Sequence, residues 1–284
     1  MQIYEAVSQH YNTFAALYER WGAGTGALHF GFFDNPVDFN EIEPEQRPAA
    51  HLQSHVRMFD VITDFINPSE GSIVVDSGCG VGGMFQYLTA RGAHVIGVNI
   101  TLEHLRKAQS MSIINMLPDI SFVFADYQIF PLKGNSVDTV LMVESFFHAP
   151  DKRTTLHEAK RILKPGGSMV IVDVMVNRNR KDLSKEQITR VQEIKNGMQG
   201  TISTDGEFET AVKVVGFDSI EFRDITPNVL PSMQRAAESG LALRNNEVVT
   251  KPIDWHGRAI LAIYDLSKQH ILRYKLIRVT KGHR

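Results

Sequence analysis

Residues 74–83 read Val-Val-Asp-Ser-Gly-Cys-Gly-Val-Gly-Gly, and this stretch decides the expected fold. An apolar strand runs directly into a glycine-rich turn, after which a helix is expected from about Met84. Glycine accepts positive φ angles and, because it has no Cβ, lets a ligand approach the backbone closely. In a doubly wound sheet, nucleotide-like ligands bind at this first strand–helix turn. A tight turn that binds no ligand would need the same glycines. Other segments of the sequence are therefore needed to distinguish a ligand-binding turn from a purely structural one.

The segments around this turn alternate between short apolar runs and amphipathic stretches. The expected strands are 72–76, 94–99, 121–125, 139–144, 168–174, 217–225 and 274–280, and the expected helices are 51–66, 102–111, 152–163, 207–215 and 231–243. Apolar strands that alternate with helices indicate βαβ units whose sheet is covered on both sides. The sequence therefore predicts an α/β fold with a mostly parallel, seven-stranded sheet and helices on both faces.

The same patterning divides the chain into two parts. Residues 1–68 are expected to form an N-terminal helical arm or lid, and residues 69–284 the sheet domain. Within that domain, the polar stretch at about 177–206 and a second one at about 227–252 are expected to form an inserted cap. One domain with a cap is the simplest organisation for a chain of 284 residues.

Composition excludes several classes of protein. The formal net charge of −2 lacks the basic excess that is usual in nucleic-acid-binding proteins. A single cysteine, Cys79, rules out an intramolecular disulfide and fits a reducing compartment, so we expect a cytoplasmic protein. No apolar run reaches the roughly 18 residues of a membrane span, and the N-terminus lacks the apolar core of a signal peptide.

Two features of the glycine turn favour an amino-acid-bearing ligand over a dinucleotide. Asp-x-Gly-x-Gly is tighter than the Gly-x-Gly-x-x-Gly of dinucleotide-binding turns, and Asp76 adds a carboxylate that can hold an ammonium group. A pyrophosphate would instead need the amides of a helix N-terminus. This turn resembles the first motif of the class I S-adenosylmethionine-dependent methyltransferases. The resemblance implies their Rossmann-like fold, with S-adenosyl-L-methionine as the cofactor and S-adenosyl-L-homocysteine as its product.

Later segments resemble the same enzymes in order and spacing. Asn99 and Ile100 follow the second strand, where these enzymes contact the ribose hydroxyls, although most carry Asp or Glu and an amide bonds less strongly than a carboxylate. Asp126 and Tyr127 match the motif that contacts the adenine amino group. The cofactor-binding residues implied by the resemblance are Asp76, Ser77, Gly78, Gly80, Asn99, Ile100, Asp126, Tyr127 and Glu144.

The choice of methyl acceptor depends on a more local resemblance. Residues 143–151 read Val-Glu-Ser-Phe-Phe-His-Ala-Pro-Asp and, together with the glycine turn and Asn99, are similar to segments of sterol C-methyltransferases. The aromatic segments 18–22 and 28–30 are similar to the N-terminal region of those enzymes. This resemblance implies C-methylation of a terpenoid, prenyl or sterol-like alkene in secondary metabolism. Because O- and N-methyltransferases of natural products share the 144–151 pattern, methylation of an alkaloid, polyketide or other natural product stays the alternative. A cofactor-binding module without catalytic activity is a third hypothesis.

The chemistry of C-methylation singles out two candidate catalytic residues. An alkene that takes up a methyl group becomes a carbocation, which needs a dry cavity with π faces or carboxylates, and then a base. Glu144 is expected to act as the base or as the cation stabiliser, and His148 as an alternative base or as an orienting residue. Equally, Glu144 could only contact the methionine end of the cofactor, and His148 could only cap a helix.

The expected substrate pocket is aromatic, with a basic segment beside it. Its residues are Tyr18, Trp21, Phe30, Phe146, Phe147, Arg178 and Arg180, although Phe146 and Phe147 could instead pack against the sheet. The two arginines would clamp a diphosphate through bidentate guanidinium contacts, unless they belong to a solvated face. No metal site is expected, because His51 and His55 share a helical face without the carboxylate of a zinc-protease pattern. The expected partner is a small molecule; the chain could also form a homo-oligomer.

Overall fold

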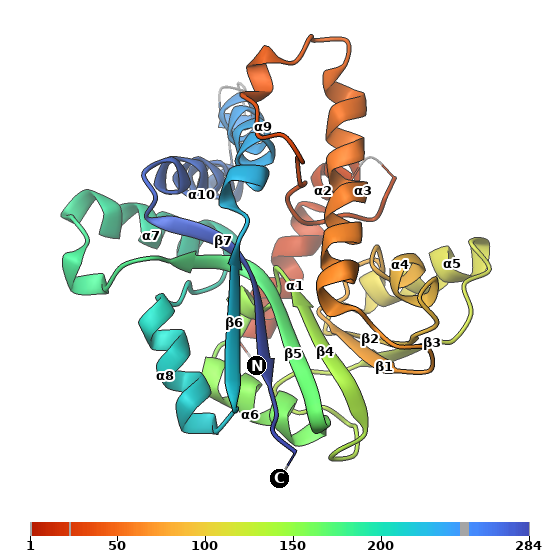
Figure 1. Cartoon of the computed structure of the whole chain (residues 1–284). Coiled ribbons are helices and arrows are strands. Elements are labelled where there is room, and N and C mark those ends of the chain that lie inside the picture. The colour runs from red at the N-terminus through yellow and green to blue at the C-terminus, as the bar shows by residue number, and fades with distance from the viewer. Residues whose placement is uncertain (1, 23, 245–249, 284) are drawn as a thin grey trace.

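The computed structural model describes residues 2–22, 24–244 and 250–283. Its centre is a seven-stranded sheet in the order β3-β2-β1-β4-β5-β7-β6, which confirms the expected Rossmann-like class I fold (Figure 1). The strands are β1 (Ile73–Ser77), β2 (His94–Asn99), β3 (Ile120–Phe124), β4 (Val137–Val143), β5 (Leu163–Val176), β6 (Ser219–Asp224) and β7 (Leu272–Thr280). Strands β1 to β5 pair in parallel, and β7 runs antiparallel to both β5 and β6.

The order of the strands places the site. The chain moves outward from β1 through β2 to β3, and then returns to start β4 on the other side of β1. Ligands bind outside the carboxyl ends of the strands at such a reversal, because the loops there separate to opposite faces. Asp76, Asn99 and Glu144 lie at or just after the carboxyl ends of β1, β2 and β4, so the topology gathers them at one edge.

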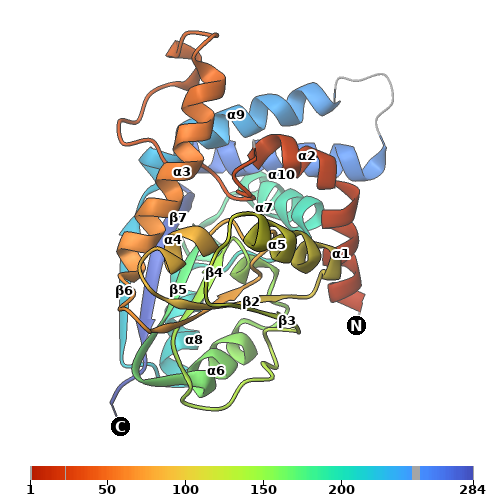
Figure 2. The same ribbon diagram turned by 90° about the vertical axis from the view of Figure 1, so that its right-hand side faces the viewer.

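Helices cover both faces of the sheet (Figure 2). Helices α3 (Arg47–Ile66), α4 (Phe85–Thr89) and α5 (Leu102–Ile114) pack on one face, and α6 (Lys152–Ile162) and α8 (Asp205–Val215) on the other. The sheet therefore has a hydrophobic core on each face. Val74 of β1 is fully buried in the core under α3, α4 and α5, and the next residue, Val75, is fully buried in the core under α6 and α8. Strands buried on both faces read as continuous apolar runs, as residues 73–75 do.

A further layer of helices lies beyond the carboxyl edge of the sheet (Figures 1 and 2). It consists of α1 (Gln2–Thr13), α2 (Ala15–Gly22), α7 (Lys185–Met198), α9 (Thr226–Arg244) and α10 (Lys251–Lys268), with α10 packed against both α7 and α9. Short 3₁₀ helices span Phe39–Glu41, Phe146–His148 and Arg180–Asp182. This layer encloses the edge where Asp76, Asn99 and Glu144 lie.

One helix of the upper layer was not predicted from the sequence. The range of about 227–252, expected to form part of the cap, holds the long helix α9 and the start of the unpredicted helix α10; residues 245–249 of that range lie outside the described residues. Helix α10 begins with Pro252 in its first turn and buries one face that includes Ile260 and Ile263. The buried face of α10 also contains His256, Gly257 and Ser267, so its apolar residues do not show a clear helical period in the sequence.

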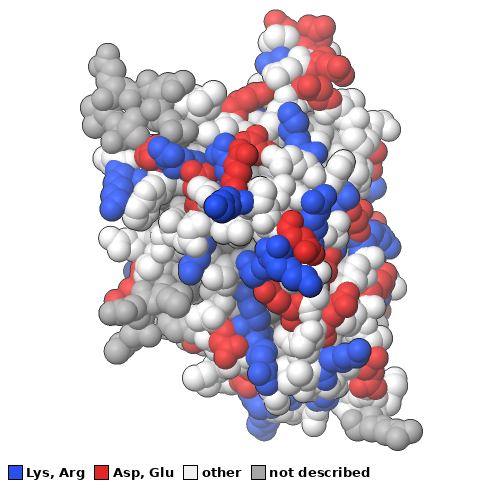
Figure 3. Space-filling model, turned by 90° about the vertical axis from the view of Figure 1, so that its left-hand side faces the viewer, with Lys and Arg blue, Asp and Glu red and all other residues white. Residues whose placement is uncertain are grey.

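The surface carries charges of both signs. On the face shown in Figure 3, Lys and Arg are interspersed with Asp and Glu, and no large area has one sign. Within the described residues, no helix is long and apolar enough to cross a membrane.

Candidate active site

Two adjoining cavities lie at the carboxyl edge of the sheet. The first, here called the glycine-loop cavity, has a volume of about 90 Å³ and is lined by Asp76, Gly78, Gly80, Asn99, Ile100 and Tyr127 among others. The second, the aromatic cavity, has a volume of about 230 Å³ and is lined by Tyr18, Trp21, Phe30 and Phe147 among others. Tyr11, Leu28, His29, Glu144 and His148 line both cavities. A group bound in one cavity can therefore lie directly beside a group bound in the other.

The glycines of the loop are required by its backbone. Gly78 has φ +80° and Gly80 has φ +54°, a region that L side chains rarely adopt. A Cβ on Gly78 would lie 2.5 Å from the Cβ of Ser145. The amide of Gly78 donates to the carbonyl of Val98 (2.8 Å), which fixes the loop over β2. The backbone therefore lines the cavity without side chains that would fill it.

Asp76 provides a buried carboxylate at the floor of the glycine-loop cavity. It is 3% exposed, and no described residue donates a hydrogen bond to its carboxylate. Burial raises the pKa of Asp76 to about 7. A desolvated carboxylate without a protein partner is suited to an organic ammonium group, so the residues fit the amino-acid end of S-adenosylmethionine.

The other candidate cofactor-binding residues divide into two groups. Gly78, Gly80, Asn99, Ile100, Tyr127 and Glu144 line the cavity with Asp76, whereas Ser77 and Asp126 do not. The Ser77 carbonyl accepts a bond from the Ser145 hydroxyl (2.6 Å), and Asp126 accepts the amide of Gln128 (2.8 Å). The adenine contact expected of Asp126 stays a prediction, because the Gln128 amide engages one of its two oxygens, Oδ1. The Asn99 side chain accepts a hydrogen bond from the backbone amide of Thr101 (3.0 Å), and Thr101 also lines the cavity.

Glu144 forms part of the wall between the two cavities. Its Oε1 accepts the backbone amide of Phe30 (2.9 Å) and the hydroxyl of Tyr274 (2.7 Å). Burial raises the pKa of Glu144 to about 8; the two hydrogen bonds oppose that rise and the charge of Asp173 adds to it. The residue has φ +44°, an uncommon conformation for a side chain other than glycine, which turns the chain sharply after β4.

His148 lies on the 3₁₀ helix that follows and bonds to two distant segments. Its Nδ1 lies 3.2 Å from the carbonyl oxygen of Gln199, and its Nε2 lies 3.0 Å from the hydroxyl of Tyr11. Since a carbonyl only accepts, Nδ1 carries the proton, and Tyr11 donates to Nε2 in the neutral ring. Burial lowers the pKa of His148 to about 4, so the ring is neutral near pH 7. Tyr11 comes from α1, which no motif in the sequence pointed to.

The expected substrate pocket is only partly assembled. Tyr18, Trp21, Phe30 and Phe147 line the aromatic cavity. Phe146 does not: it is 1% exposed and packs edge-to-face on Phe208, in the core on the opposite side of the sheet. Neighbouring residues of this turn point to different faces, so one phenylalanine lines the cavity and the other fills the core.

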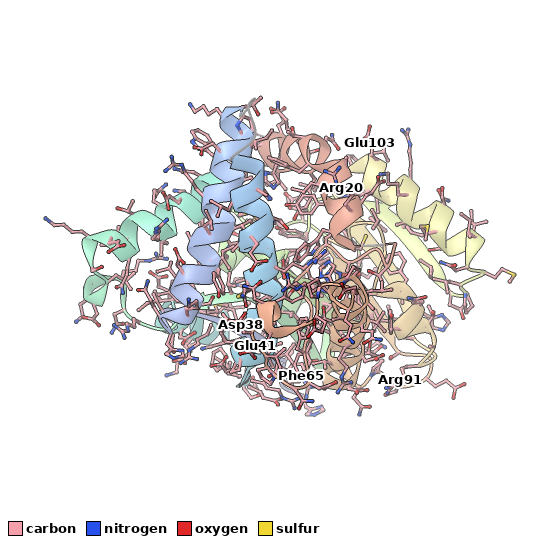
Figure 4. The ribbon with its side chains drawn as sticks, turned by 90° about the horizontal axis from the view of Figure 1, so that it is seen from above. Arg20, Asp38, Glu41, Phe65, Arg91 and Glu103 are labelled. Atoms are coloured by element: carbon pink, nitrogen blue, oxygen red, sulfur yellow. The ribbon has the colours of Figure 1, made fainter. Side chains whose placement is uncertain are left out.

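The expected arginine clamp is not part of the cavity either. Arg180 pairs with Glu207 (2.6 Å) and donates to the carbonyl of Ile202, and neither Arg178 nor Arg180 lines the aromatic cavity. Two other arginines do line it, Arg20 from α2 and Arg235 from α9, and Figure 4 shows Arg20 on the upper side of the molecule. Neither arginine belongs to a recognisable motif, so their position at the cavity follows only from how α2 and α9 pack.

The described part of the chain contains no cluster of three His, Cys, Asp or Glu side chains arranged to hold a metal ion. The His51 and His55 rings pack against each other and against Trp21. Burial lowers the pKa of His51 to about 4 and that of His55 to about 2. Both histidines are thus neutral core groups near pH 7.

Comparisons with known proteins find methyltransferases. Residues 75–171 match a family model described as a methyltransferase domain. The chain is 26% identical to 27-O-demethylrifamycin SV methyltransferase of Amycolatopsis mediterranei, over 84% of this chain and 83% of that protein. It is 28% identical to sterol 24-C-methyltransferase of Pneumocystis carinii, over 81% of this chain and 58% of that protein. Geranyl diphosphate C-methyltransferase from Streptomyces coelicolor A3(2) has the same fold, with a TM-score of 0.79, 18% identity, and coverage of 99% of this chain and 98% of that one.

The fold is that of the class I methyltransferases, and residues 75–171 match a methyltransferase domain. The protein is an S-adenosylmethionine-dependent methyltransferase that acts on small molecules. This confirms the class and the cofactor expected from the sequence.

Proposed function

We propose that this methyltransferase transfers the methyl group to a carbon atom of an alkene, in a terpenoid, prenyl or sterol-like substrate of secondary metabolism. The observation that carries the proposal is the position of Glu144, a residue that lines both the glycine-loop cavity and the aromatic cavity. S-adenosylmethionine, when bound, supplies an electrophilic methyl group. A base for the substrate is then needed where the two cavities meet, and Glu144 lies there.

The side chains around Glu144 suit the two demands of C-methylation. Trp21, Phe30 and Phe147 present aromatic surface to the aromatic cavity, and aromatic faces attract a developing carbocation. The Glu144 carboxylate can stabilise that charge and then accept the proton that restores the alkene. Its pKa of about 8 is near the operating pH, which is where a general base is most effective.

O- or N-methylation is the alternative. The relatives include 27-O-demethylrifamycin SV methyltransferase of Amycolatopsis mediterranei as well as the sterol 24-C-methyltransferase of Pneumocystis carinii. O-methylation would require a base that removes the proton of the substrate hydroxyl, and His148 would be the simplest candidate. Both nitrogens of His148 are engaged, however, by Tyr11 and Gln199, and burial holds its pKa at about 4. The ring is therefore a weak base unless Tyr11 moves away.

Product analysis tests the proposal. The enzyme is incubated with methyl-labelled S-adenosylmethionine and panels of isoprenoid alkenes, phenols and amines, and each product is examined by mass spectrometry and NMR. We expect a new carbon–carbon bond to the labelled methyl group, and a loss of at least a hundredfold in kcat for Glu144→Gln, with S-adenosylhomocysteine binding retained. Glu103→Gln, an exposed position on α5 (Figure 4), is the matched control. Label found only on oxygen or nitrogen would overturn C-methylation.

A further inference from the structure

The aromatic cavity has a buried end and an exposed end. Glu144 and His148 lie at the buried end, which adjoins the glycine-loop cavity. Arg20 and Ser239 line the same cavity and are exposed to solvent, so they mark its outer end. Arg235, from the same helix as Ser239, also lines this cavity.

Arg235 is a partly buried cation without an ion-pair partner among the described residues. Its Nε is buried, and no described residue accepts a hydrogen bond from it or forms an ion pair with it. Its guanidinium carbon lies 5.4 Å from the centre of the Phe39 ring. Burial lowers the pKa of Arg235, and the charge of Glu238, one turn along α9, opposes this. Glu238 accepts a bond from Gln234 (3.5 Å), and within the described residues it forms no ion pair with Arg235.

Arg20 has no described acidic partner either, in contrast to Arg180, which is paired with Glu207. The histidines on the cavity wall do not change the positive charge that Arg20 and Arg235 contribute. Burial lowers the pKa values of His29, His148 and His256 to about 4, so these rings are neutral near pH 7.

The described acidic side chains of the cavity, Asp173 and Glu144, already accept hydrogen bonds from other residues. Both oxygens of Asp173 accept backbone amides, from Phe147 (2.8 Å) and Val174 (2.9 Å). Glu144 accepts its two bonds at the buried end of the cavity. The outer end is therefore positive, and the wall leading inward from it is aromatic.

We infer that Arg20 and Arg235 together bind the anionic head group of the substrate. The substrate class is an amphiphile with a carboxylate or phosphate head, whose apolar chain extends along Trp21 and Phe147 toward Glu144. Guanidinium groups suit such anions because they form bidentate, charge-assisted bonds. This inference rests on the proposed function for the reacting end of the substrate, and assigns to α2 and α9 the clamp that the sequence had placed at Arg178 and Arg180.

Trp21 lines the aromatic cavity, so its fluorescence reports binding without any methyl transfer. In a Trp255→Phe background, which leaves Trp21 as the single tryptophan, the protein is titrated with geraniol, geranic acid and geranyl diphosphate, in the presence of S-adenosylhomocysteine. These probes share one chain and differ in the head group. We expect at least one anionic probe to bind tenfold or more tightly than geraniol; which one does so distinguishes a carboxylate site from a phosphate site.

The variants Arg235→Gln and Arg20→Gln should each reduce that preference severalfold and leave geraniol binding unchanged, while Arg235→Lys should retain part of it. Arg178→Gln and Arg180→Gln are the matched controls and should behave as the parent. Equal binding of all three probes, or an anion preference that survives the double Arg20/Arg235 substitution, would overturn the inference.

The two proposals fail in distinguishable ways. An anion preference that disappears in the Arg20 and Arg235 variants supports the head-group site even if the methyl group is found on a heteroatom. Conversely, a carbon-methylated neutral product with no anion preference supports the proposed function and overturns the head-group site.

Discussion

The hydroxyl of Tyr274 lies 2.7 Å from Oε1 of Glu144, a contact between the last strand of the sheet and the turn that follows β4. Tyr274 is fully buried, and its hydrogen bond stabilises the ionised form of the carboxyl group. The antiparallel strand β7 therefore adjusts the acidity of a residue 130 positions earlier in the chain.

Tyr274→Phe should shift the pH dependence of catalysis. Removing a hydrogen bond to the carboxylate raises the pKa of Glu144 further above its present value of about 8. If Glu144 acts as a base, the acid limb of the kcat/KM profile moves upward by about one pH unit, the size expected for one such bond. Tyr264→Phe on α10 is the control. An unshifted profile in Tyr274→Phe would show that the contact does not tune the reaction.

Cofactor affinity should depend on pH through Asp76. The pKa of this carboxyl is about 7 in the protein, so it is largely protonated at pH 6 and largely ionised at pH 8. Because only the ionised form attracts an ammonium group, the affinity for S-adenosylhomocysteine should rise between these values in calorimetric titrations. Asp76→Asn should bind at least tenfold more weakly and lose much of the pH dependence, whereas the exposed substitution Asp64→Asn should change neither. A full pH dependence in Asp76→Asn would assign the titration to another group.

Gly78→Ala should damage both stability and cofactor binding. The new Cβ would meet Ser145 at 2.5 Å, and the φ of +80° is unfavourable for alanine, so we expect a loss of about 1–3 kcal/mol in the free energy of unfolding. Gly206→Ala is a matched control, because that glycine lies in α8 with no atom within 4 Å of the new Cβ. It should be neutral or stabilise by up to about 1 kcal/mol. Thermal unfolding and S-adenosylhomocysteine titration measure the two effects, and equal behaviour of the variants would contradict the strain argument.

His55 should make the protein less stable in acid. Its two ring nitrogens are buried without described partners, and burial lowers its pKa from 6.5 to about 2. Since the unfolded chain binds a proton to this ring below about pH 6.5 and the folded chain does not, the stability contributed by neutral His55 is lost as the pH falls from 7 to 5. At pH 5 this amounts to about 2 kcal/mol at most.

His55→Leu isolates this effect, because both polar nitrogens are removed together from an apolar site. Relative to the parent protein, the variant should gain stability at pH 5 compared with pH 7, as measured by urea unfolding at each pH. His157→Leu on α6 is the control, and a constant stability difference at both pH values would contradict the assignment. The comparison of variant with parent cancels Asp76, Glu144 and Asp173, whose raised pKa values act in the opposite direction.

The sequence predicted the sheet well because each buried strand is short, apolar and bounded by a turn. It also predicted the glycine loop, where positive φ demands glycine at Gly78 and Gly80. It did not predict α10, and β5 begins earlier than expected, at Leu163, with a register shift in its pairing to β4.

The site was predicted less completely, for a physical reason. Asp76, Asn99 and Glu144 follow strands, so the topology alone gathers them at one edge. Tyr11, Arg20 and Arg235 come from helices whose placement depends on how the upper layer packs, and no local pattern specifies that. The same limit explains Phe146 and Arg180: each has the right chemistry, but one side chain points into the opposite core and the other pairs with Glu207.

The wall shared by the two cavities has a consequence for how the ligands affect each other. Tyr11, Leu28, His29, Glu144 and His148 border both spaces, so a molecule in one rests against side chains that also contact a molecule in the other. Any shift that the first ligand imposes on these side chains changes the binding free energy of the second. Thermodynamic linkage then makes the influence reciprocal, with the same coupling factor in both directions. If the cofactor binds in the glycine-loop cavity and the substrate in the aromatic cavity, as proposed, each ligand is an effector of the other through this shared wall.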